Sequence, residues 1–171
     1  VMHVLLLALN YYPDKLGNAP LMTGMAEGLV ARGHQVTVVC AFPHHETGRI
    51  DPAYRGKAVA RETRNGVRIL RTYIYAPEGG TVAKMANYAS FTATAFAVSQ
   101  LVRDVDVIFT PSPPLTLGLV DYALSRMRRV PFVYNLQDLF PEAAVRLGVL
   151  TNPKVIAAFE KLEAFVYRKA H

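Results

Sequence analysis

Short apolar runs alternate with longer amphipathic segments along this chain. Residues 3–9, 36–41, 105–110 and 131–136 are almost continuously apolar, which is typical of strands buried on both faces of a parallel sheet. Between the first two runs, apolar residues recur at helical spacing, at Met22, Met25, Ala26, Leu29 and Val30. The pattern therefore predicts a strand–helix–strand unit, the building block of α/β sheets.

Further helices are predicted over residues 82–102, 115–128 and 141–147, and from Pro153 onwards. The last helix is expected to bury Val155, Ile156, Phe159, Leu162, Phe165 and Val166.

Polar residues and glycines mark the ends of these elements. Asn18 and Asn152 are placed to cap helices, and Gly33 is placed to end one. Two apolar-alternating runs, 58–63 and 67–75, flank Asn65-Gly66, which predicts a β-hairpin. The predicted fold class is α/β: a doubly wound, mostly parallel, Rossmann-like sheet with a β-hairpin insertion.

Such sheets bind ligands beyond the carboxyl ends of their strands, near the point where the strand order reverses. Three segments follow strands and should meet there: residues 10–18, 111–114 and 137–142. We therefore expect one cleft lined by these segments.

The cleft lacks several well-known signatures. Its first loop has a single glycine, Gly17, so the dinucleotide fingerprint is absent, and there is no phosphate loop, Cys-x-x-Cys, His-Glu-x-x-His or Gly-x-Ser-x-Gly motif. The adjacent His44 and His45 alone are a weak metal signal. The one cysteine, Cys40, excludes a disulfide framework and favours a cytoplasmic protein.

The chain of 171 residues has a formal net charge of +6, and 51% of its residues are hydrophobic. It is therefore long and apolar enough for one domain with a real core. Much of the positive charge lies in residues 48–72, at Arg49, Arg55, Lys57, Arg61, Arg64, Arg68 and Arg71. This segment is either a solvated face of the hairpin or a surface for an anionic partner, with Arg61, Arg64 and Arg68 binding a membrane or a lipid diphosphate. No recognition motif supports nucleic acid as the partner.

The uncharged run 85–102 is nearly long enough to span a bilayer. Its many alanines and polar residues favour a packed helix, and no signal peptide precedes it. The expected location is cytoplasmic, with peripheral attachment at the inner membrane face as the further hypothesis.

A series of motifs follows along the chain: Tyr12-Pro13, Ala26-Glu27-Gly28-Leu29, Arg32-Gly33-His34, Phe42-Pro43-His44-His45-Glu46-Thr47-Gly48, Pro111-Ser112-Pro113-Pro114-Leu115 and Gln137-Asp138-Leu139-Phe140-Pro141-Glu142. In this order and spacing they resemble the N-terminal domain of family 4 retaining glycosyltransferases of the GT-B fold. The similarity is greatest to the WcaI-like branch, which builds colanic acid and related exopolysaccharides.

The resemblance implies a two-domain enzyme whose site lies between two Rossmann-like halves. Residues 1–171 would form the acceptor-side half, incomplete at its C-terminal end, and the donor-binding domain would be absent, so this fragment alone is expected to be inactive. The implied substrates are a nucleotide diphosphate sugar and a lipid-linked or saccharide acceptor. No cofactor or metal is expected.

The resemblance also assigns residues to roles. Gly17 and Asn18 would lie against the donor diphosphate, since helix starts favour anions; Asn18 is alternatively only a cap. Gln137 and Asp138 stand where many relatives have His-Asp, near the reacting sugar. Glutamine binds sugar hydroxyls but is no general base, and Asp138 is alternatively a cap of the following helix.

The remaining candidates would bind the acceptor: His45, Ser112, Glu142 and Tyr12. Each has a structural alternative, such as a loop histidine or a carboxylate favoured in the first turn of a helix. Tyr11, Tyr12 and Tyr88 are further candidates for lining a sugar or lipid path, or for packing.

Two other functions remain open. One is a GT-B sugar-nucleotide epimerase, which would act on free nucleotide sugar. The other is a non-catalytic α/β module that binds an anionic glycan or lipid. The transferase is preferred, on the basis of fold analogy.

Overall fold

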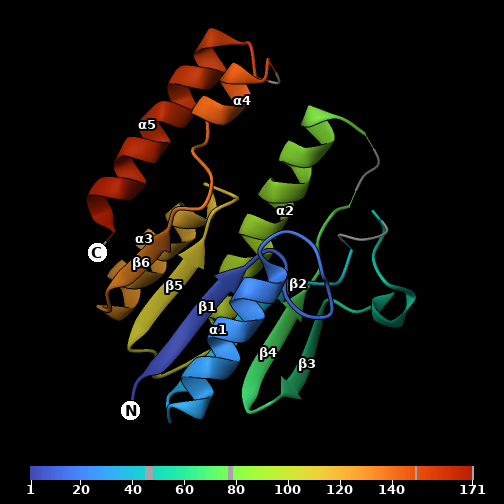
Figure 1. Cartoon of the computed structure of the whole chain (residues 1–171), viewed down its shortest axis with the longest axis vertical. Coiled ribbons are helices and arrows are strands. Elements are labelled where there is room, and N and C mark those ends of the chain that lie inside the picture. The colour runs from blue at the N-terminus through green and yellow to red at the C-terminus, as the bar shows by residue number, and fades with distance from the viewer. Residues whose placement is uncertain (45–47, 77–78, 149, 171) are drawn as a thin grey trace.

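The computed structural model describes residues 1–44, 48–76, 79–148 and 150–170, which form a central sheet covered by helices (Figure 1). The strands are β1 (His3–Ala8), β2 (Gln35–Ala41), β3 (Val59–Arg64), β4 (Val67–Thr72), β5 (Val107–Pro111) and β6 (Phe132–Asn135). The helices are α1 (Ala19–Ala31), α2 (Thr81–Ser99), α3 (Leu117–Arg128), α4 (Glu142–Arg146) and α5 (Pro153–Lys169), with a short 3-10 helix, η1, at Pro52–Tyr54. The predicted α/β class is confirmed.

The six-stranded sheet has the order β3-β4-β2-β1-β5-β6. Within the described chain, β3 pairs antiparallel with β4 and the other pairings are parallel. The chain moves outward from β1 in both directions, so the strand order reverses between β1 and β5. β3 and β6 are the edge strands.

The alternating side chains of β1 supply two cores. Val4, Leu6 and Ala8 pack with Met22 and Ala26 of α1. Leu5 and Leu7 belong to the other core, which contains buried residues of α2, α3 and α5, such as Phe91, Val120 and Val166. Because both faces of β1 are covered, its sequence is a continuous apolar run rather than an alternating one.

Two of the three residues predicted to end or cap helices do so. Gly33 follows α1 with φ +85°, and its N–H donates to the carbonyl of Val30 at 2.9 Å. Asn152 caps α5, because its side chain accepts from the N–H groups of Lys154 and Val155. Asn18 occupies the cap position of α1, but its side chain makes no capping hydrogen bond, so the predicted cap is wrong there.

The predicted hairpin is confirmed. Asn65 and Gly66 turn with positive φ, as a two-residue hairpin requires. The turn packs against α1, where Glu27 Oε1 accepts from Arg64 Nε at 3.0 Å and from Asn65 Nδ2 at 2.9 Å.

The interpretation of residues 48–72 as one solvated basic face is wrong for Arg71. This side chain is 1% exposed. Its guanidinium donates to Glu62 Oε2 at 2.8 Å, to the carbonyl of Tyr12 at 2.5 Å and to Cys40 Sγ at 3.5 Å. Arg71 shares the face of β4 that carries Val67 and Ile69, which pack in the core on the α1 side. Its side chain therefore points toward α1, and Glu62 balances its charge there.

The last helix is less buried than predicted. Val166 is fully buried, but Val155 is 37% exposed, because the first turns of α5 extend past the end of the sheet (Figure 1). In the described part of the chain no helix combines the length and the apolar character needed to span a bilayer.

Two titratable groups lie deep in the core. Asp121 of α3 is fully buried, and Thr110 Oγ1 donates to its Oδ1 at 2.7 Å. Burial raises the pKa of Asp121 well above its ordinary value, against the smaller effect of that hydrogen bond. Burial likewise raises the pKa of the Cys40 thiol to about 12.

Candidate active-site cleft

A cleft of about 580 Å³ opens at the carboxyl ends of β1, β2 and β5. Its wall is drawn from the three predicted segments, from α1 and α2, and from the loops that follow β2 and β4. The lining residues are Leu9, Asn10, Gly17, Asn18, Leu21, His44, Gly48, Ala76, Gly79, Ala83, Lys84, Asn87, Tyr88, Pro113, Gln137 and Asp138. The predicted meeting of segments 10–18, 111–114 and 137–142 is thus observed, beside the point where the strand order reverses.

The turn that carries Gln137 and Asp138 is held by Ser112. The buried Ser112 Oγ accepts from the backbone N–H of Gln137 at 2.8 Å and from that of Asp138 at 3.1 Å. One hydroxyl at the end of β5 therefore fixes the residues that follow β6. Ser112 itself does not line the cleft, so this geometry makes it a positioning residue, and its predicted acceptor contact stays a prediction.

The alternative role of Asp138 as a helix cap is not seen. α4 begins after Pro141, and no side chain caps it. The carbonyl of Asp138 accepts from the N–H of Phe140 at 3.0 Å. Asp138 lines the cleft together with Gln137.

Gly17 and Asn18 lie at the start of α1. Gly17 takes a positive φ of 63°, which glycine adopts without strain. The first turn of α1 contains no acidic residue, so its N–H groups are favourable for an anion. The Oδ1 atoms of Asn18 and Asn10 are buried in this wall, and neither has a hydrogen-bond partner among the described residues.

The opposite wall is the first part of α2. Lys84, Asn87 and Tyr88 share one face of the helix, with Lys84 Nζ at 5.6 Å from the centre of the Tyr88 ring. Burial raises the pKa of Tyr88, which therefore stays a neutral phenol. Asn87 Nδ2 donates to the carbonyl of Tyr75 at 2.8 Å and ties the helix to the segment after β4.

From the sequence, Asn10 is placed in a segment that lines the cleft and Tyr88 is named as a lining candidate, but no role is assigned to Lys84 or Asn87. The spacing of residues 84, 87 and 88 places them on one helical face. A polar stripe near the start of an otherwise apolar helix was therefore the available signal.

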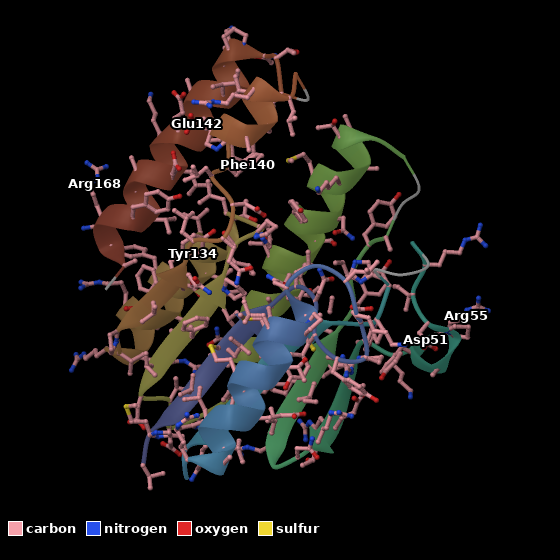
Figure 2. The ribbon with its side chains drawn as sticks, viewed as in Figure 1. Asp51, Arg55, Tyr134, Phe140, Glu142 and Arg168 are labelled. Atoms are coloured by element: carbon pink, nitrogen blue, oxygen red, sulfur yellow. The ribbon has the colours of Figure 1, made fainter. Side chains whose placement is uncertain are left out.

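Two predicted acceptor residues lie away from the cleft lining. The centre of the Tyr12 ring lies 3.5 Å from the central guanidinium carbon, Cζ, of Arg64. The backbone carbonyl of Tyr12 accepts a hydrogen bond from Arg71. Glu142 lies on α4, near Phe140 (Figure 2), outside the cleft lining, and its carboxylate pairs with Arg146 Nη2 at 2.5 Å. His45 lies outside the described residues.

The three arginines proposed to bind an anionic partner, Arg61, Arg64 and Arg68, do not share one face. Arg64 points toward α1 and pairs with Glu27 at 3.0 Å. Arg61 and Arg68 line a groove of about 610 Å³ near the amino ends of β1 and β2, where Arg68 Nη2 lies 3.2 Å from His3 Nε2. This groove is at the opposite end of the sheet from the cleft. Their binding to a membrane remains a prediction.

Within residues 1–44, 48–76, 79–148 and 150–170, no group of three or more His, Cys, Asp or Glu side chains is arranged to hold a metal ion. The expectation that no metal takes part stays a prediction.

The fold corresponds to a known class of protein domain, that of the glycosyltransferases of the GT-B fold. Residues 17–171 match the glycosyl transferase 4-like domain, and the chain belongs to that family. Among curated proteins it is similar to the colanic acid biosynthesis glycosyl transferase WcaI of Escherichia coli (strain K12), with 25% identity over 156 residues. That alignment covers 90% of this chain and 38% of WcaI.

Solved structures support the same fold. Sucrose-phosphate synthase from Thermosynechococcus elongatus superposes with a TM-score of 0.63 at 14% identity, over 99% of this chain and 41% of that protein. MurG from Acinetobacter baumannii gives a TM-score of 0.50 at 16% identity, over 99% of this chain and 40% of MurG. The chain therefore spans about two fifths of the length of these relatives.

Proposed function

We propose that this domain provides the acceptor side of a retaining glycosyltransferase, which moves a sugar from a nucleotide diphosphate sugar to an acceptor hydroxyl. The observation that carries the proposal is the cleft at the carboxyl end of the sheet. Polar groups suited to sugar hydroxyls meet there, on Asn10, Asn18, Gln137 and Asp138. Neutral amides and a carboxylate bind hydroxyls without needing a metal or a cofactor.

The donor diphosphate would lie against Gly17 and Asn18. The start of α1 has no side-chain capping hydrogen bond from Asn18 and no acidic side chain in its first turn, which supports binding of an anion there. The nucleotide and most of the donor sugar would be bound by a second domain, so the chain of 171 residues alone is expected to be inactive.

The proposed reaction needs no general base from Gln137. The bond between the sugar C1 and the diphosphate oxygen breaks, a bond from C1 to the acceptor oxygen forms on the same face, and the acceptor proton passes to the departing phosphate. Gln137 would hydrogen-bond the reacting sugar, and Asp138 would orient the acceptor hydroxyl. Ser112 would keep both in place through their backbone N–H groups.

The acceptor would be a lipid-linked or saccharide molecule of bacterial polysaccharide synthesis, as the similarity to WcaI suggests. The enzyme would then act in the cytoplasm, at or near the inner face of the membrane.

The test is donor turnover by the full-length protein. Nucleoside diphosphate release is measured with a panel of nucleotide sugars, with and without a membrane-lipid extract as acceptor. We expect Gln137→Ala and Asp138→Asn each to lower kcat/KM by about a hundredfold, while Glu160→Gln, on the exposed face of α5, leaves it unchanged. Sugar epimerised without any acceptor would identify an epimerase instead. Equal activity of both cleft variants and the Glu160 control would refute the assignment of the site.

A further inference from the structure

A second, apolar groove of about 630 Å³ adjoins the cleft. It lies between the first turns of α2, the segment after β5, and the helices α4 and α5, which extend past the end of the sheet beside α2 (Figure 1). The side chains that define its character are Met85, Ala89, Leu115, Phe140, Ala144 and Phe159. Phe140, at the foot of α4 (Figure 2), packs edge-to-face on Phe159, with ring centres 4.9 Å apart.

The groove and the cleft are continuous. Gly79, Lys84, Tyr88, Pro113 and Asp138 line both. A single ligand can therefore extend from the apolar groove into the polar cleft, and Lys84 lies where the two meet.

The chemistry of the groove selects among ligands. A saccharide would leave its apolar walls unused, and its hydroxyl groups would lose their hydrogen bonds to water there. A peptide would bring backbone N–H and C=O groups that need partners, which these walls do not supply. A hydrocarbon chain has no such requirement, and it gains from burial. Lys84 supplies a cation for a phosphate at the junction, and the first turn of α2 contains no acidic residue.

We propose that the acceptor is a hydroxyl-bearing head group linked through a phosphate to a hydrocarbon chain, with the chain in the apolar groove, the phosphate at Lys84 and the reacting hydroxyl of the head group in the cleft. The inference rests on the proposed function and narrows the acceptor to one class. It also places the membrane-facing end of the molecule at the carboxyl end of the sheet, opposite the groove that contains Arg61 and Arg68.

The test is equilibrium binding to the full-length protein, with geranylgeranyl diphosphate as the probe and inorganic diphosphate as its head group alone. Each methylene that becomes buried strengthens binding by about fourfold, so the prenyl probe should bind at least a hundredfold more tightly than inorganic diphosphate. Farnesyl diphosphate, with a shorter chain, should fall between them.

Two variants on α2 locate the chain. Ala89 and Ala97 are both exposed alanines of this helix, but only Ala89 lines the groove. We expect Ala89→Glu to weaken binding of geranylgeranyl diphosphate by at least tenfold. Ala97→Glu should leave its binding unchanged. Lys84→Gln should weaken binding of geranylgeranyl diphosphate by about tenfold. Binding of geranylgeraniol, which has the same chain but no phosphate, should not change.

The outcomes separate this inference from the proposed function because binding is measured without turnover. Donor turnover together with no prenyl binding, or with equal loss in the Ala89 and Ala97 variants, would overturn the lipid acceptor and leave the transferase standing. Prenyl binding lost only in the Ala89 variant supports the groove assignment, even if no donor is turned over. If another segment of the full-length protein covers the groove, geranylgeranyl diphosphate should not bind. That result would also overturn the lipid acceptor.

Discussion

Replacing Arg71 with methionine should strongly destabilise the fold. Methionine fills a similar apolar volume but removes the guanidinium that binds Glu62, the Tyr12 carbonyl and Cys40. Glu62 then loses its cation. The Tyr12 carbonyl loses the donor that ties the loop of residues 10–18 to the hairpin.

The size of the effect follows from these contacts. Removing one partner of a buried ion pair costs about 3–5 kcal/mol. The Glu62 side chain is 33% exposed, so water relieves part of its loss and favours the lower end of that range. The orphaned carbonyl adds roughly 1 kcal/mol. We therefore expect a loss of about 4 kcal/mol in the free energy of unfolding, a large share of the roughly 5–15 kcal/mol typical of a domain.

Urea unfolding followed by far-ultraviolet circular dichroism measures this loss. With a slope of about 2 kcal/mol per molar urea, the midpoint should fall by roughly 2 M. Arg61→Met is the matched control on the neighbouring strand, where an exposed arginine should cost less than about 0.5 kcal/mol. Arg71→Lys keeps the positive charge but lacks the several N–H donors of the guanidinium, so its loss of stability should lie between those of Arg71→Met and Arg61→Met. If Arg71→Met and Arg61→Met lost the same stability, the buried guanidinium would not hold the loop as described.

Three further predictions test other parts of the molecule. Ser112→Ala in the full-length enzyme should lower kcat by about tenfold or more because the turn of Gln137 and Asp138 loses its acceptor; unchanged kcat would show that the turn holds itself. Cys40, whose pKa is raised to about 12 by burial, should resist iodoacetamide at pH 8 in native protein and react in 6 M guanidinium, as mass spectrometry would report; rapid native alkylation would contradict this. Asp121 has a raised pKa in the folded state, so it favours folding when protonated, and that contribution is lost as pH rises from the ordinary carboxyl range through the folded pKa. As pH rises from 4 to 8, the free energy of unfolding of the Asp121→Asn variant should therefore increase relative to that of the native chain. A difference that does not depend on pH would refute the argument.

Much of the fold follows from local pattern. The runs of β1, β2, β5 and β6 are apolar because both sheet faces are covered, and the Asn65-Gly66 turn needs no distant information. The position of the cleft follows as well, because parallel strands bring their carboxyl ends to one edge.

The direction of individual side chains could not be predicted in the same way. Tyr12 belongs to a loop that reaches the cleft, yet its ring stacks under Arg64. Arg71 looks like one more charge in a basic segment, and its burial becomes evident only when the strand register brings it beside Glu62. Lys84 was missed because its importance depends on two cavities that meet only in the folded molecule.

The two edges of the sheet differ in how they meet solvent. β3 carries Arg61, Glu62 and Arg64 along its length, and an incoming strand would have to desolvate these charges. β6, with the sequence Phe-Val-Tyr-Asn, has no charge, and in the described chain no strand pairs with its outer side. In the isolated domain, strands from other molecules would therefore pair with β6 rather than with β3. Preparations of it should therefore be handled dilute, and a lysine introduced on β6 is the direct way to keep it monomeric.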